Sequence, residues 1–163
     1  MMAAAVVTVS DSAARGERAD LSGPATAEVL RQHGFDVTIQ RIVADDQAQI
    51  EDILVQLAEQ VQLVVTTGGT GIAERDVSPE ATRAVCSKLI EGIPEKMRLE
   101  GLAKTPYASL GRGVCGVRGS SLILNLPGSP KGAVDSLQSV IRILPHAIDL
   151  LAGKTGHGDV ESL

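Results

Sequence analysis

Short apolar runs alternate with amphipathic runs along the chain, a pattern typical of strands joined by helices. Residues 4–9 and 61–67 are almost entirely apolar or β-branched and predict buried strands, whereas residues 35–43 begin in alternation and predict a half-buried strand. Residues 114–118 and 121–126 flank Gly119–Ser120 and predict a hairpin. Apolar residues at helical spacing predict helices over 24–33, 50–61, 78–89, 94–105 and 129–153.

Several residues predict where these helices begin and how they run. Ser78 and Ser129 each precede a proline, as N-terminal caps often do, and Asp46 is placed to cap the helix that follows it. Pro145 predicts a kink in the last helix, because proline removes a backbone hydrogen bond there. Leu102 is predicted on the apolar side of the helix over 94–105.

The order of strands and helices predicts the fold. Alternating strands and helices favour a single α/β domain over residues 1–153, three layers (α/β/α) with a mostly parallel sheet that the hairpin makes mixed. Residues 154–163 predict a polar C-terminal tail. Ligands of such sheets bind at the carboxyl ends of the strands, so we expect the loops to converge there, at 10–23, 44–46, 67–76 and 127–131.

Composition narrows the class of protein. Hydrophobic residues make up 44 % and charged residues 21 % of the chain, no run approaches the ~18–20 apolar residues of a membrane span, and the N-terminus lacks a basic flank. We therefore expect a cytoplasmic protein with no membrane partner. Cys86 and Cys115 are far apart and predict buried thiols rather than a zinc site or a disulfide. Phe35 and Tyr107 are the only aromatic residues, which argues against a nucleic-acid partner.

Charge is distributed unevenly. The net charge is −5, yet residues 101–134 contain no acid and four cations, Lys104, Arg112, Arg118 and Lys131. Such a stretch can attract an anionic ligand, although four spread cations are equally typical of a solvated face.

The strand at 61–67 runs into a glycine loop, Gly68–Gly69–Thr70–Gly71, which Arg75–Asp76 follows. Glycines after a strand let backbone N–H groups approach a phosphate, and Asp76 can hold a cation. The loop lacks the Gly-Lys-Ser/Thr of a Walker A loop, and Glu74 stands where a dinucleotide motif needs its third glycine. An anion site is therefore predicted, although glycines at a strand end can also form only a turn. If Ser78 caps the next helix, the carboxylate of Asp76 is free for a cation.

Four motifs occur in order over nearly the whole chain, namely Thr8–Val9–Ser10–Asp11, Asp20–Leu21–Ser22–Gly23, Thr67–Gly71 with Arg75–Thr82, and Leu124–Pro130. Together they resemble the MogA/MoaB family of molybdenum-cofactor biosynthesis, which includes the G domain of gephyrin. The resemblance implies a molybdopterin-binding α/β/α fold, usually a homotrimer. It also implies an adenylyltransferase that joins molybdopterin and Mg-ATP, releases pyrophosphate, and passes its product to a molybdate-inserting protein.

The resemblance also implies the site residues. The family's two acids fall on Asp76 and Asp45, which would be catalytic and would hold Mg²⁺. The nucleotide and its phosphates would be bound by Ser10, Asp11, Asp20, Ser22, Gly23, Gly68, Gly69, Thr70, Gly71, Pro127, Gly128, Ser129 and Lys131. Molybdopterin would be bound in the basic stretch by Ser109, Arg112, Arg118, Gly119 and Ser120.

Two departures and three alternatives accompany this resemblance. Ala44 replaces a proline that often precedes the first acid, and Gly111 replaces a serine that commonly precedes the arginine. The main alternative is a non-catalytic molybdopterin carrier of the MoaB type, although the presence of both acids favours the enzyme. A gephyrin-like scaffold has little support in this chain. Asp45 could also be a simple turn residue, and Ser22 and Ser129 could be caps instead of ligands.

Overall fold

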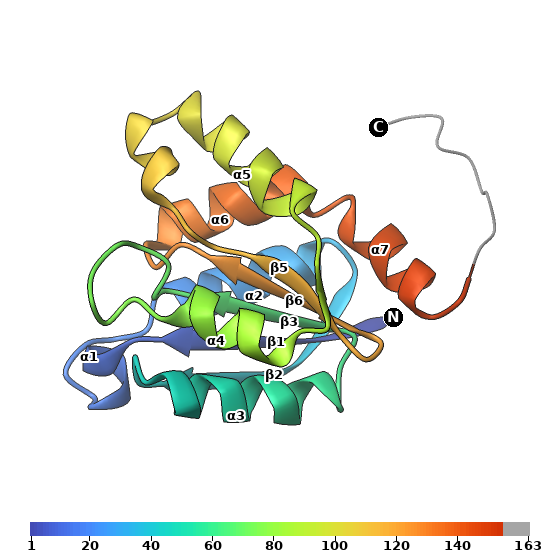
Figure 1. The fold of residues 1–163 in the computed structure, drawn as a ribbon, viewed down its shortest axis with the longest axis horizontal. Coiled ribbons are helices and arrows are strands. Elements are labelled where there is room, and N and C mark those ends of the chain that lie inside the picture. The colour runs from blue at the N-terminus through green and yellow to red at the C-terminus, as the bar shows by residue number, and fades with distance from the viewer. Residues whose placement is uncertain (155–163) are drawn as a thin grey trace.

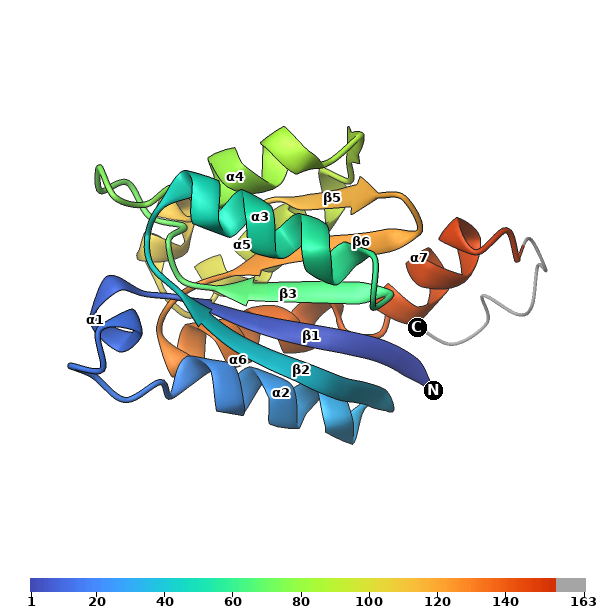
Figure 2. The same ribbon diagram turned by 90° about the horizontal axis from the view of Figure 1, so that it is seen from below.

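The computed structural model describes residues 1–154, which form a six-stranded sheet with helices on both faces (Figures 1 and 2). The strands are β1 Met2–Val9, β2 Phe35–Val43, β3 Leu63–Thr67, β4 Lys88–Leu89, β5 Cys115–Arg118 and β6 Ser121–Leu126. They lie in the order β2-β1-β3-β6-β5-β4, in which the first four are parallel and β5 and β4 are antiparallel to their neighbours. The predicted three-layer fold with a mixed sheet is confirmed.

The helices are α1 Asp11–Ala14, α2 Ser22–Gln32, α3 Gln47–Ala58, α4 Ser78–Val85, α5 Gly92–Leu102, η1 Pro106–Leu110, α6 Pro130–Val140 and α7 Leu144–Leu151. Helices α3 and α4 cover one face of the sheet, while α2, α5, α6 and α7 pack on the other. None of the helices in residues 1–154 is long and apolar enough to cross a membrane. The predicted tail lies outside the described residues, apart from Lys154.

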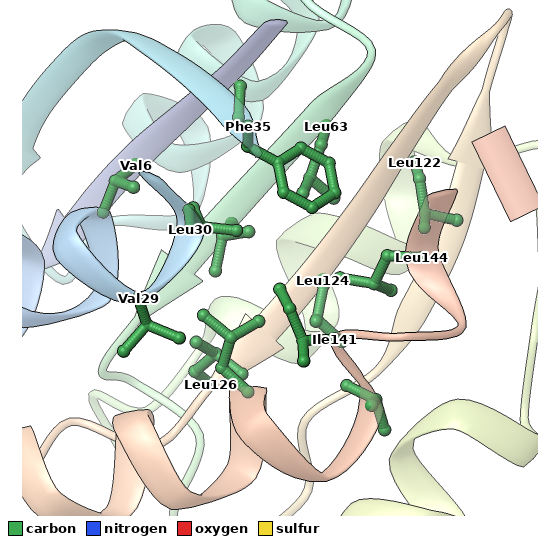
Figure 3. Packing of buried hydrophobic residues seen from close by; sticks show 14 of the residues in the cluster. Val6, Val29, Leu30, Phe35, Leu63, Leu122, Leu124, Leu126, Ile141 and Leu144 are labelled. Atoms are coloured by element: carbon green, nitrogen blue, oxygen red, sulfur yellow. The ribbon is translucent and has the colours of Figure 1, made fainter. Parts of the chain in front are cut away.

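Successive strand residues point to opposite faces, and this divides the core in two. On β1, Ala4 and Val6 face the larger cluster beneath α2 and α6, whereas Ala5 and Val7 face α3 and α4. The larger cluster is shown in Figure 3, where Leu124 and Leu126 from β6 lie beside Ile141. Because the central strands are covered on both faces, their runs contain almost no polar residue.

Helix α4 differs from the prediction at both ends. It ends at Val85 instead of residue 89, because the next residues pair with β5: Ser87 N–H donates to Val117 O at 2.8 Å and Ile90 N–H to Cys115 O at 2.8 Å. Ser78 is not the cap. It is the first helical residue, and its hydroxyl donates to the Gly68 carbonyl at 2.8 Å.

Three other expectations are corrected. The last predicted helix is two helices, since Pro145 stands in the first turn of α7 and would clash with the carbonyl of Ile141 if the helix were continuous. The loop after β1 contains the short helix α1, which Ser10 caps by accepting from Ala13 N–H at 3.2 Å. Leu102 is 46 % exposed, so it lies outside the apolar side of α5. The caps predicted at Asp46 and Ser129 are confirmed.

Candidate active site

The predicted loops converge at the carboxyl edge of the parallel strands, on the left in Figure 1. Gly68 follows β3 with a φ of 93°, and its N–H donates to Leu126 O at 3.1 Å, which ties the glycine loop to the end of β6. A Cβ on Gly68 would lie 2.3 Å from Val9 O, and a Cβ on Gly128 would lie 3.2 Å from Gly68 Cα. Three chain segments therefore meet with no room for a side chain.

The glycine loop presents unpaired backbone donors. Within residues 1–154, no hydrogen bond uses the N–H groups of Gly69, Thr70 or Gly71. Gly69 has a φ of 67°, so the backbone turns sharply at this point. Consecutive free N–H groups in such a turn form a concave site for an anion, as the sequence predicts. The N–H of Gly68 cannot serve, because Leu126 already accepts it.

Two acids lie directly against this loop. A Cβ on Gly69 would come within 3.4 Å of Asp45 Oδ1, and a Cβ on Gly71 within 2.8 Å of Asp76 Oδ2. Asp76 is not as free as the sequence suggests, since its Oδ2 accepts from Ala73 N–H at 3.0 Å and closes a turn. Its Oδ1 makes no hydrogen bond within the described residues. Asp76 thus occupies space that only a glycine at position 71 leaves open, whereas at Gly69 the close neighbour is Ser78 Oγ, 2.4 Å from an added Cβ.

Asp45 and Asp11 hold each other in place. Asp11 N–H donates to Asp45 Oδ2 at 2.8 Å, and Asp45 N–H donates to Asp11 Oδ1 at 3.0 Å. The guanidinium of Arg75 donates to both oxygens of Asp11, at 2.5 and 2.9 Å. That bond lowers the pKa of Asp11, whereas burial, with the charges of Asp11 and Asp76, raises the pKa of Asp45.

This arrangement suits a divalent cation that arrives with its ligand. The described residues contain no group of three or more His, Cys, Asp or Glu side chains that could hold a metal alone. Mg²⁺ commonly takes one or two protein carboxylates and completes its shell with water and substrate phosphates. Asp45 and Asp76, beside free N–H groups for phosphate, are such a donor set.

Arg112 reaches the same loop from the opposite side. Its Nε donates to Gly71 O at 2.7 Å, its Nη2 donates to Asp76 O at 2.8 Å, and Nη1 pairs with Glu80. Its own N–H also donates to Thr70 O at 2.9 Å. The guanidinium predicted to bind molybdopterin also fastens the glycine loop to α4.

A cavity of about 470 Å³ opens beside the glycine loop. Thr70, Gly71, Gly128 and Ser129 form one wall, and α5, η1 and α6 form the others. Met97 and Leu110 provide apolar surface. The charged lining residues are Arg98, Glu100, Lys104 and Asp135, and Lys104 Nζ bridges α5 to α6 by pairing with Asp135 Oδ1 at 3.2 Å. A cavity of this volume can hold a small-molecule ligand.

Several predicted ligand residues have structural partners. Asp20 accepts from Thr8 Oγ at 2.8 Å and from Gly23 N–H at 3.0 Å, and the Ser22 hydroxyl bonds with that of Thr67 at 2.8 Å. These residues join β1, β3 and α2.

The remaining predicted residues differ in where they lie. Ser109 is exposed and donates to Pro106 O at 2.7 Å, while Lys131 pairs with Asp135 at 2.7 Å. The hairpin places Arg118, Gly119 and Ser120 at the opposite edge of the sheet, about 16 Å away at ~3.3 Å per residue. Arg118 Nη1 donates there to Val85 O at 2.8 Å. The structure does not bring these three residues to the site.

Sequence reasoning missed three side chains of this region. Arg75 directly precedes Asp76 in the glycine-loop motif, and that position was its signal. Arg98 and Asp135 stand on helices whose pattern shows only amphipathic spacing, so no local signal marks them.

Comparisons with known proteins relate the whole domain to one family. A family model described as a probable molybdopterin binding domain matches residues 5–146. The chain is 43 % identical over 152 residues to a molybdopterin adenylyltransferase of Helicobacter pylori, covering 91 % of this chain and 86 % of that protein. The chain is 49 % identical in sequence to the molybdopterin biosynthesis enzyme MoaB from Thermus thermophilus. The crystal structure of that protein superposes on this one with a TM-score of 0.89, covering 94 % of this chain and 98 % of that one. The Mog protein of Mycobacterium ulcerans is 41 % identical, with a TM-score of 0.87 over 93 % and 99 % of the two chains.

Proposed function

The chain belongs to the family of molybdopterin-binding domains of molybdenum cofactor biosynthesis, and we propose that it is an adenylyltransferase that joins molybdopterin to the AMP part of Mg-ATP. The observation that supports this most strongly is a shared wall. Thr70, Gly71, Gly128 and Ser129 belong both to the phosphate loops and to the 470 Å³ cavity. A heterocycle in the cavity would thus carry its phosphate to the place where the nucleotide phosphates bind.

The reaction is an in-line transfer. A phosphate oxygen of molybdopterin attacks the α-phosphorus of ATP, the bond to the β-phosphate oxygen breaks, and pyrophosphate leaves. The protein supplies no nucleophile. The N–H groups of Gly69, Thr70 and Gly71 would stabilise negative charge on the phosphate oxygens, and hydrogen bonds from Ser78 and Arg112 hold the loop in this conformation.

Asp45 and Asp76 would hold Mg²⁺ against the ATP oxygens. When bound, the cation offsets charge on the phosphates as the transition state forms. Asp45 is partly buried, so bulk water solvates its carboxylate less well than it would an exposed one. A bound cation would therefore stabilise the charge of Asp45 more than that of an exposed carboxylate.

The reaction is tested by incubating the protein with Mg-ATP and molybdopterin while pyrophosphate and the adenylylated product are measured together. Asp45→Asn and Asp76→Asn keep the shape of each side chain and remove its charge, so we expect at least a hundredfold loss of kcat. Asp46→Asn is the matched control, because asparagine caps α3 as well as aspartate does and removes a charge one residue from Asp45. Molybdopterin binding without product, in the wild type as in the variants, would instead establish a carrier.

A homotrimer in the cytoplasm, with transfer of its product to a molybdate-inserting protein, remains part of this proposal. Light scattering of the purified protein measures the assembly directly, and a monomeric mass would exclude the trimer.

A further inference from the structure

A triphosphate in the proposed site faces an excess of negative charge. Asp11, Asp45 and Asp76 all lie at the mouth of the glycine loop. One Mg²⁺ offsets only part of the charge of ATP, and N–H groups carry no full charge. A side-chain cation at the mouth would therefore strengthen nucleotide binding.

Two arginines reach this loop, and they differ in availability. The guanidinium of Arg112 is bound on three sides, by Gly71 O, Asp76 O and Glu80. Arg75 makes ion-pair contacts with Asp11 alone among the described residues, and its side chain is 64 % exposed. It belongs to the exposed segment 72–75 that follows the glycine loop.

The bond between Arg75 and Asp11 is easily exchanged for another. The two partners differ in exposure, since the Arg75 side chain is 64 % exposed and that of Asp11 only 22 %. Water can therefore solvate the guanidinium when it leaves Asp11, and a phosphate can replace the carboxylate as its bidentate partner. Asp11 stays in position without Arg75, since its N–H and its Oδ1 are both bonded to Asp45. Arg75 is thus the mobile partner, and Asp11 is the fixed one.

We propose that Arg75 is a phosphate ligand that exchanges partners. In the empty site Arg75 neutralises Asp11, and on nucleotide binding its guanidinium turns to the β- and γ-phosphates that later leave as pyrophosphate. A guanidinium suits this role, because its fork of N–H donors can bind two phosphate oxygens at once. This inference rests on the proposed function, and it adds the group that binds the leaving part of the nucleotide.

The test is direct binding of α,β-methylene-ATP, which cannot transfer its AMP, measured by calorimetry with and without Mg²⁺. Arg75→Gln should weaken binding about tenfold or more, the effect of losing a charge-assisted hydrogen bond. Arg15→Gln is the matched control: Arg15 is 60 % exposed and pairs with Glu17 in the same two-bond manner. It is near enough for its charge to act on Asp11, but within residues 1–154 it makes no hydrogen bond to the glycine loop, so the control removes the nearby charge without removing the proposed ligand.

Asp11→Asn separates partner exchange from a merely structural bond. If the pair only fastens the loop, Asp11→Asn and Arg75→Gln remove the same bond and should weaken binding equally, which would overturn the proposal. If Arg75 exchanges partners, Asp11→Asn leaves the guanidinium of Arg75 free. Without Mg²⁺, the analogue should then bind to the Asp11→Asn variant at least as tightly as to the wild type. Unchanged binding in Arg75→Gln would also overturn it. A wild type that binds no nucleotide would reject the proposed function and this inference together.

Discussion

Gly68→Ala should damage both stability and catalysis, and the structure separates the causes. Gly68 combines a φ of 93° with a close approach, since its added Cβ would lie 2.3 Å from Val9 O. Gly34 ends α2 with a φ of 84°, but a Cβ there would meet nothing within 4 Å. Gly34→Ala therefore measures the cost of the backbone conformation alone, and Gly68→Ala adds the steric contact.

The two costs can be estimated. An alanine at positive φ costs about 1–2 kcal/mol, which is the whole expected effect of Gly34→Ala. At Gly68 the carbonyl must move by about 0.7 Å to reach even the 3.0 Å limit of real Cβ contacts, and such overpacking adds ~1–3 kcal/mol. Because the same shift displaces the N–H groups of Gly69 to Gly71, we expect kcat to fall by about ten- to a hundredfold.

Urea unfolding of the two variants measures the first effect, and pyrophosphate release at saturating substrate measures the second. Gly34→Ala should leave kcat unchanged, because Gly34 lies at the start of β2, at the other edge of the sheet. Equal unfolding free energies for the two variants would show that the contact with Val9 carries no cost and would refute the reasoning.

Three further predictions concern other side chains. Arg112→Ala should cost about 1–2 kcal/mol in urea unfolding, since its bonds to the glycine loop are partly exposed, and it should lower kcat more than Glu80→Gln does. Burial raises the pKa of Asp45 above its ordinary 3.8, so the native state binds the carboxyl proton more tightly than the unfolded state does. Urea titrations should therefore show the stability of the wild type falling relative to that of Asp45→Asn as the pH rises from 3.8 through the raised pKa. Burial raises the pKa of Cys86 to about 11 and of Cys115 to about 12, so both thiols should react with Ellman's reagent at pH 8 far more slowly in the native protein than in urea.

The fold could be predicted from the sequence because its main signals are local. A strand such as β3, covered on both faces, contains only apolar or β-branched residues, and a two-residue Gly-Ser turn joins antiparallel strands. The end of α4 could not be predicted, because β4 stops that helix by pairing with β5, some 30 residues later in the chain. Pro145 was recognised, but only packing decides between a kink and a break.

The site was predicted less evenly. The glycine loop and its two acids lie together as expected, because parallel strands bring their following loops to one edge. Arg118 lies away from that edge, and the order of the strands already implies this position. Strand β6 is parallel to β3, so β6 begins at the amino edge of the sheet, opposite the glycine loop. The turn Gly119–Ser120 directly precedes β6, and it therefore lies at that amino edge together with Arg118.

The motif Asp20–Leu21–Ser22–Gly23 shows why a resemblance cannot by itself separate chemistry from architecture. The carboxylate of Asp20 accepts hydrogen bonds from the Thr8 hydroxyl and from the N–H of Gly23. A Cβ on Gly23 would lie 2.4 Å from Asp20 Oδ2 and 2.4 Å from Thr8 Oγ1. Ser22 is bonded to Thr67, the last residue before the glycine loop. A change in this motif would alter nucleotide binding without touching the nucleotide, because it would move the end of β3. Only the contacts of each side chain therefore distinguish a residue that holds the glycine loop in place from one that binds the ligand.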